Sequence, residues 1–456
     1  MLSDRFRGGK CRYFCLQLLG FPWLDLGVLM KHREPPKSLC QTQAELDKFS
    51  NLPGHVIDQI LSQLSIRDAV RTSVLSTKWR YKWTTIPNLV FDNQCLTFTS
   101  QDQTVIKNKL VNVIDHVLLL HTGPIYKFKL SHRDLIGITD IDKWILHLSR
   151  SPIREFVLEI WKGQRYKLHS SLFSCQDLIH LELFNCLLRP PATFRGFKNL
   201  KSLDLQHVTM AQEVFESLIS SCPLLERLTL MNFDGFTHLN IDAPRLLFFD
   251  VGGYFDDITF TNTFNLALIS IGLYADEKVE RRSARNSSNL LKFFAHLPNI
   301  RRLEIQSYFL KYLAAGDVPG RLLYPCTDLG YLSIRINLDD FAENSAALCL
   351  LRSSPNLQEL EILARPEEPS SGATCLSFWE GEQKYCKFSQ LRLVKIYGVS
   401  GIKTELEFIR FVLLASPVLE KMIIKPAPVN EGMEMVKELL RFRRASVQAE
   451  IVYVDP

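Results

Sequence analysis

Eleven cysteines and eleven histidines are the residues of this 456-residue chain best suited to nucleophilic or metal chemistry. The cysteines are scattered, and no Cys-x-x-Cys pair or other zinc-ligand spacing occurs. Cys375 and Cys386 bracket Trp379 in a predicted loop, where unrelated thiols are favoured over a zinc or redox pair. The sequence also lacks a Gly-rich phosphate loop, a Gly-x-Ser-x-Gly elbow and a His-Glu-x-x-His pair. We therefore predict a non-catalytic protein without metal or cofactor, with reduced thiols and a location in the nucleus, the cytoplasm or both.

The charge distribution argues against a general nucleic-acid partner, and the hydropathy of the N-terminal segment argues against a membrane partner. The net charge is +5, but residues 1–40 hold seven Lys/Arg and three Asp/Glu, so the rest of the chain is nearly neutral. A general nucleic-acid binder would need a basic face, which such a body lacks. The apolar run from Phe14 to Met30 is interrupted by Pro22 and Asp25, which disfavours a membrane span or a signal peptide. We predict a poorly ordered extension over residues 1–44, and neither a nucleic-acid nor a membrane partner.

The elements that could position a binding surface begin at residues 45–92. Apolar residues from Leu52 to Leu64 recur at the spacing of one helical face, and Pro53 stands at the helix start, where proline is tolerated. Ser65 and Asp68 form a capping pattern for a second helix. Ser76 is expected to cap a third, on which Trp79 and Trp83 would share a face. Three such short helices bury little core of their own, so they are expected to pack against a neighbouring domain or a partner protein.

The run from Phe49 to Asp92 resembles the plant F-box. The matching features are Leu52-Pro53, Val56-Ile57, Ile60-Leu61-Ser62, Leu64, Ile66-Arg67-Asp68-Ala69-Val70, Val74-Leu75-Ser76, Lys78-Trp79-Arg80 and Trp83. Ser65 departs from the family, which usually has proline there. The resemblance implies docking on a Skp-type adaptor, and through it on cullin and RING subunits. The adaptor contacts that it implies are Leu52, Pro53, Val56, Ile57, Ile60, Leu61, Leu64, Val74 and Trp79.

Internal repeats follow the F-box-like run. Twelve segments carry apolar residues at i, i+3 and i+5, from Ile125/Phe128/Leu130 to Leu419/Met422/Ile424, with a mean interval near 27 residues. Ile86/Leu89/Phe91 is a candidate earlier segment. Helical stretches lie between them, for example Glu213–Ser220, Asn289–His296, Glu343–Arg352 and Glu405–Ala415. This period predicts an irregular leucine-rich-repeat solenoid over residues 93–384, with parallel strands on the concave face and helices outside. A generic α/β domain with leucine-rich strands is the alternative.

The positions between the apolar ones face solvent in this arrangement. Only six of the 24 residues at i+2 and i+4 are apolar or aromatic, whereas hydrophobic residues make up 46% of the whole chain. This difference is expected of strands with one solvent-exposed face. We predict that Phe248, Leu268 and Tyr331 contribute to binding a target protein, because apolar anchors often carry interface energy. Lys127 and Lys129 on one repeat, and Arg227 and Arg302 on two others, also lie at such positions.

Residues 385–456 resemble the plant FBD domain. The match rests on LRLVKIYGVSG from Leu391, on Glu405-Leu406, Phe408-Ile409, Leu413-Leu414, Ser416-Pro417 and Leu419-Glu420, and on the closing LLRFRRASVQAEIVYVD. Two strand–helix units and a last strand at Ala449–Val454 are expected to cap the open end of the solenoid.

Taken together, the resemblances imply an α/β protein that acts as the substrate-recognition subunit of an SCF-type ubiquitin ligase. The F-box would bind the adaptor, and the repeats would bind an unidentified target, so that ubiquitin transfer belongs to the partners. Two alternatives use the same scaffold. One is a receptor that needs a small molecule or hormone to hold its target, and the other is an interaction scaffold without a role in degradation.

Overall fold

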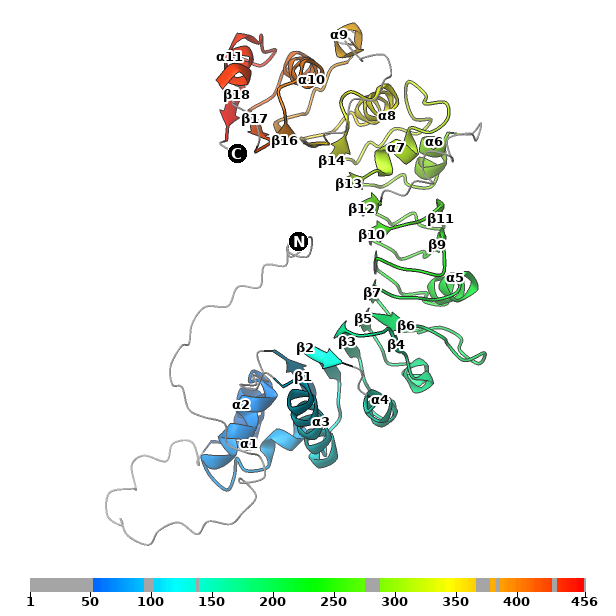
Figure 1. Cartoon of the computed structure of the whole chain (residues 1–456), viewed down its shortest axis with the longest axis vertical. Coiled ribbons are helices and arrows are strands. Elements are labelled where there is room, and N and C mark those ends of the chain that lie inside the picture. Colours follow the sequence, from blue (N-terminus) through cyan, green and yellow to red (C-terminus); the bar gives the residue numbers. More distant parts are fainter. Residues whose placement is uncertain are drawn as a thin grey trace, which may run out of the picture. The chain divides into compact units, whose positions relative to one another are not determined.

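The computed structural model describes residues 52–93, 102–136, 139–274, 288–365, 378–382, 386–428 and 433–454 (Figure 1). The predicted extension over residues 1–44, the first residues of the F-box and Cys375 lie outside these ranges. The described residues all belong to one compact unit, which spans Leu52–Pro456.

Two α-helices open the described chain, α1 (Gly54–Ser62) and α2 (Ile66–Arg71). The Asp68 amide donates to the Ser65 Oγ over 3.1 Å, and the Ser65 hydroxyl donates to the Asp68 carboxylate over 2.9 Å. The predicted cap is therefore present, and it starts α2 at the place where the F-box family usually carries proline.

The third predicted helix of the F-box is replaced by two short 3₁₀ turns, η1 (Thr72–Val74) and η2 (Lys82–Thr85). Thr84 and Thr85 in η2 each donate a hydroxyl hydrogen bond to the carbonyl three residues earlier, over 2.7 and 2.9 Å, and Thr72 does the same at the start of η1. Such local bonds compete with a continuous helix. Trp79 and Trp83 nevertheless both point into the core, with 1% and 7% of their surface exposed.

Fourteen strands form one parallel sheet that runs through the whole unit (Figure 1). In spatial order they are β1 (Asn88–Asp92), β2 (Lys127–Ile136), β3 (Glu155–Lys162), β5 (His180–Phe184), β7 (Ser202–Gln206), β8 (Arg227–Met231), β10 (Phe248–Gly253), β12 (Leu268–Leu273), β13 (Arg302–Ser307), β14 (Tyr331–Ile336), β15 (Glu359–Ala364), β16 (Leu393–Val399), β17 (Lys421–Pro426) and β18 (Glu450–Tyr453). Each neighbouring pair is parallel, and spatial order follows chain order. The prediction of repeated strands, including the early one at Ile86–Phe91 and the last one after Ala449, is confirmed.

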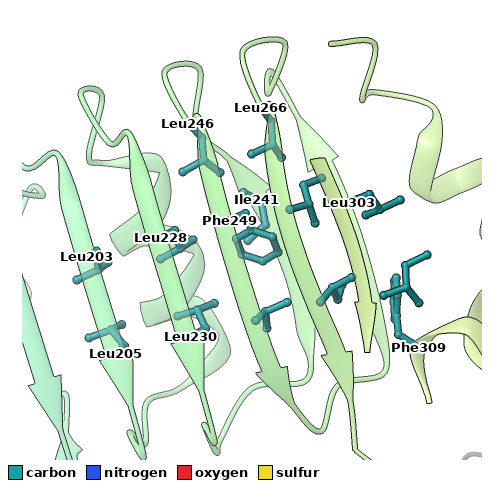
Figure 2. Packing of buried hydrophobic residues seen from close by; sticks show 14 of the residues in the cluster. Leu203, Leu205, Leu228, Leu230, Ile241, Leu246, Phe249, Leu266, Leu303 and Phe309 are labelled. Carbon is teal, nitrogen blue, oxygen red and sulfur yellow. The ribbon is translucent and has the colours of Figure 1, made fainter. Parts of the chain in front are cut away.

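The register aligns the apolar positions of successive repeats into continuous rows. Leu203 pairs with Leu228, which pairs in turn with Phe249, and Leu205 pairs with Leu230. These side chains point to the same side of the sheet and are at most 1% exposed (Figure 2). Each repeat therefore completes the core of its neighbours, as in other solenoids.

Helices cover the apolar side of the sheet over much of its length. They are α3 (Gln103–Leu120), α4 (Ile141–Leu148), α5 (Gln212–Ser220), α6 (Asn289–Phe294), α7 (Phe309–Leu313), α8 (Phe341–Arg352), α9 (Phe378–Glu382), α10 (Lys403–Ala415) and α11 (Met433–Arg441), with a 3₁₀ turn η3 (Ser170–Ser174). The predicted helices at Glu213, Asn289, Glu343 and Glu405 are among them.

Short strands stand in the outer layer where the prediction has only helices. β9 (His238–Asp242) pairs with β11 (Asp257–Thr261), and β4 (Tyr166–Lys167) pairs with β6 (Cys186–Leu187). β9 and β11 belong to the two shortest intervals, 21 residues from Leu225 to Leu246 and 20 from there to Leu266. An extended return segment fits where so few residues leave little room for a helix.

The C-terminal strands β16, β17 and β18 continue the same sheet. The Glu405 carboxylate accepts from the amides of Ser400 and Gly401 over 2.7 Å, which fixes the start of α10. Trp379 on α9 packs against Phe408 and Phe411 of α10, with ring centroids 4.9 and 5.0 Å apart. Among the described residues, none of the helices combines the length and hydropathy needed to cross a membrane.

Candidate functional site

The F-box presents several apolar side chains to solvent. Ile60 on α1 is 37% exposed, while Val74 and Leu75 in the following turn are 70% and 49% exposed. Pro53 is also exposed, and Leu52 is half-buried. Val56 and Leu64 of the predicted set are half-buried as well. Exposed aliphatic groups concentrated in one small module indicate a surface for a partner.

Three of the predicted contact residues lie instead inside the protein's own core. Ile57 is fully buried, and Leu61 and Trp79 are 1% exposed. They belong to the same apolar cluster as Trp83 and Leu89. Their position means that they brace α1 and the turns, while Pro53, Ile60 and Val74 remain available for contact.

Polar contacts hold this module against the start of the sheet. The Thr122 amide donates to the Thr84 carbonyl over 2.9 Å, and a ring nitrogen of His121 lies 2.8 Å from the Ile86 carbonyl. Within the module, the Lys82 ammonium lies 3.1 Å from the Asp58 carboxylate. The exposed apolar groups are therefore presented by a framework joined to β1 and α3.

The second candidate surface is the solvent-facing side of the sheet. Register places Arg227, Phe248, Leu268, Arg302 and Tyr331 directly beside one another, on the consecutive strands β8, β10, β12, β13 and β14. The Arg227 guanidinium lies 4.2 Å from the Phe248 ring centroid, and that of Arg302 lies 3.6 Å from the Tyr331 ring centroid. This row, called the aromatic–arginine row below, combines flat rings and guanidinium groups of the kind enriched in interfaces.

A second row on the same face is acidic. It contains Glu182, Asp204, Asp250, Glu304 and Glu361, the i+4 residues of five repeats, while the strands between them carry Thr229, Ser270 and Ser333 at that position. Burial, aided by the charges of Glu182 and Asp250, raises the pKa of Asp204 to about 6. Burial and the charge of Glu304 likewise raise the pKa of Asp250, whereas a hydrogen bond from His180 lowers the pKa of Glu182. This face therefore concentrates negative charge beside the aromatic–arginine row.

The described cysteines are poor candidates for chemistry. All six are free and buried, and burial raises the pKa values of Cys175, Cys186 and Cys326 to about 12. At neutral pH these thiols stay protonated, and a thiol is a far weaker nucleophile than a thiolate. No group of three or more His, Cys, Asp or Glu side chains suited to a metal ion occurs in the part of the chain that the structure describes.

Sequence reasoning located the row residues but missed their grouping. Phe248, Leu268 and Tyr331 lie on one row, as the common i+2 position implies, but the stacking of the two arginines on their neighbours was not foreseen. This grouping depends on strand register, because residues 20 to 34 positions apart become direct neighbours only when equivalent positions of successive strands pair. The residues of the acidic row are visible in the sequence as i+4 residues, two of them on repeats that also carry the aromatic–arginine row.

Comparison with known proteins agrees with this architecture. Residues 49–91 match the F-box domain, residues 141–362 match the leucine-rich repeats of "FBD-associated F-box protein At5g56370", and residues 385–424 match the FBD.

Relatives from Arabidopsis thaliana match over most of their length. F-box/FBD/LRR-repeat protein At1g13570 is 44% identical over 90% of this chain and 99% of its own length. Probable FBD-associated F-box protein At1g32375 is 26% identical over 88% of this chain and 98% of its own length. F-box/FBD/LRR-repeat protein At5g53840 is 28% identical over 84% and 88% respectively. The F-box, the repeat sheet and this full-length similarity together show that the chain belongs to the F-box/FBD/LRR-repeat proteins, a family of adaptor type.

Proposed function

We propose that the chain is the substrate-recognition subunit of an SCF-type ubiquitin ligase. The F-box binds a Skp-type adaptor and, through it, the cullin and RING subunits. The solvent-facing side of the repeat sheet holds the target protein. The chain itself supplies no chemistry and acts by bringing a lysine of the target close to the ubiquitin-charged enzyme, which raises its effective concentration.

The observation that carries the adaptor proposal is the division of the F-box side chains into two sets. Ile57, Leu61 and Trp79 hold the fold, whereas Ile60 and Val74 project apolar surface without a partner in the described chain. Burying an aliphatic side chain against a partner stabilises a complex by roughly 1.5–3 kcal/mol. A few such groups therefore suffice for a stable contact.

The test is co-purification of the full chain with a Skp-type adaptor, compared with a Leu52→Ala/Pro53→Ala variant. Pro53 is exposed and Leu52 is only partly buried at the edge of the core, so the variant is expected to fold like the parent and to lose the adaptor. Equal recovery of adaptor by the two proteins would reject the proposed docking surface. Adaptor binding without turnover of any bound target would instead indicate a scaffold without a role in degradation.

We also propose that the protein works in the nucleus, the cytoplasm or both, where its six described thiols would stay reduced. A fluorescent fusion of the full chain tests this location, and a signal confined to a secretory compartment would contradict it.

A further inference from the structure

A small recess opens on the solvent-facing side of the sheet where β3, β5 and β7 end, away from the aromatic–arginine row. Its lining consists of Glu159, Trp161, Glu182, Leu183, Phe184 and Gln206. The buried Leu183 forms part of its floor, and the two carboxylates and two aromatic rings form most of its wall.

The aromatic part of the wall is preformed. The Trp161 and Phe184 ring centroids lie 4.5 Å apart at an interplanar angle of 32°, and Phe184 lies 4.9 Å from the His207 ring. Trp161 is still 40% exposed, which is a large exposed area for an indole. Burial and the nearby Arg165 lower the pKa of His207, so this ring stays neutral near pH 7 and adds no positive charge.

The acidic part of the wall is only partly neutralised. Glu159 accepts a hydrogen bond from the Ser131 hydroxyl over 2.7 Å and lies 3.6 Å from the Lys129 ammonium. Glu182 lies 3.6 Å from the ring of His180, and the charge of the same Lys129 also helps to lower the pKa of Glu182. Asp204 lies on the neighbouring strand β7, where Gln206 donates to it over 3.0 Å. Glu159 and Glu182 line the recess and Asp204 lies beside it, so these three neighbouring carboxylates share one lysine and one histidine.

We propose that this recess binds the cationic side chain of an arginine or lysine in the target protein. The proposal rests on the proposed function and names the chemistry of the target that this part of the sheet recognises. An aromatic face attracts a cation through the ring quadrupole, and the adjacent carboxylates supply the opposite charge. An acidic target group would meet like charge, and an apolar group would add no positive charge to the carboxylates of the recess. Charge complementarity thus selects a basic segment of the target.

The Asp204 carboxylate gives this binding a dependence on pH. The charged and titratable groups that face it are Glu182 and His180 on β5 and Asp250 on β10, while β8 places Thr229 opposite it. Burial is the main cause of its raised pKa of about 6, and an arginine brought beside it would stabilise its ionised form. Affinity is therefore expected to rise between pH 5 and pH 7.5.

The experiment is saturation-transfer NMR on the full chain with N-acetylarginine methylamide as probe, because this method detects weak ligands of large proteins. N-acetylcitrulline methylamide, nearly the same shape without the charge, is the matched probe. The lysine and glutamate analogues complete the set. Trp161→Ala and Glu182→Gln are compared with Tyr254→Ala, which removes another exposed aromatic ring that packs on Tyr274 elsewhere on the sheet.

We expect saturation transfer from the protein to the arginine and lysine probes, and little transfer to the citrulline probe. Trp161→Ala and Glu182→Gln should each weaken binding by about fivefold or more, and Tyr254→Ala should leave it unchanged. Equal transfer to arginine and citrulline, preferred binding of the glutamate analogue, or unaltered binding by the two recess variants would overturn the proposal. Adaptor co-purification is measured on the same variants. Retained adaptor with no cation binding would reject the recess alone, whereas loss of adaptor by the parent would reject the ligase function.

Discussion

Truncation of Val74 separates adaptor contact from folding. Its side chain is 70% exposed in the free chain, so Val74→Ala removes two methyl groups that contact mostly water. At about 0.8 kcal/mol per buried carbon, full burial of both would contribute about 1.6 kcal/mol to a complex. Scaled by the exposed fraction, the expected loss is about 1.1 kcal/mol, or a roughly sixfold weaker Kd for the adaptor. Isothermal titration with purified Skp-type adaptor measures it directly.

Two further variants are needed to interpret the expected sixfold change in Kd. Val447→Ala is the matched control, because this valine of the C-terminal segment is fully exposed and should affect neither binding nor stability. Ile57→Ala creates a cavity at a fully buried position and should lower the free energy of unfolding by about 2–5 kcal/mol. If Val74→Ala binds the adaptor like Val447→Ala, the exposed turn is not the contact surface. If Ile57→Ala unfolds at the parent temperature by scanning calorimetry, the division into bracing and contacting residues is wrong.

Three more predictions concern the repeats. Phe248→Ala with Tyr331→Ala should weaken target capture while adaptor binding stays at the parent level, and equal capture by both proteins in a pull-down with an identified target would exclude the aromatic–arginine row. Because folding raises the pKa of Asp204 from its ordinary value near 3.8 to about 6, the folded state binds more protons between those values, so this residue lowers stability as pH rises from 4 to 6. Asp204→Asn should therefore raise the free energy of unfolding by up to about 3 kcal/mol at pH 7 but hardly at pH 4, and a gain that is equal at both pH values in urea titrations would contradict this. Arg365→Leu leaves the buried Glu343, 2.5 Å away, without its partner and should cost about 3–5 kcal/mol, much of which the added Glu343→Leu should restore in the same assay.

The strands could be predicted well from the sequence, because apolar residues recur at the same relative positions in each repeat. Leu203 and Leu205, or Leu360 and Ile362, alternate with polar residues, and this alternation depends only on which face of the strand is buried. The helices were equally predictable where the intervals are long, as at Glu343 and Glu405.

Features that depend on tertiary context were harder to predict. The Trp79–Trp83 segment has helical spacing, yet threonine hydroxyls and the docking of both rings onto β1 and its neighbours favour 3₁₀ turns. Ile57 and Ile60 are both apolar residues of one short helix, and only packing shows that the first faces inward. In the same way, Trp161 and Glu182 lie on different repeats, and their meeting at one recess follows from strand register.

Because strand pairing is unbroken from β1 to β18, the number of intervening strands sets the distance along the sheet between the F-box and any target-binding strand. Adjacent strands lie about 4.8 Å apart, and six such steps separate β1, which is fixed to the F-box, from β10, which carries Phe248. The contour along the sheet between them is therefore roughly 29 Å, and it can change only in whole strand spacings. Gain or loss of one repeat would move a bound target relative to the adaptor by one such step. Repeat number would thus select which lysines of a target come within reach of the ubiquitin-charged enzyme.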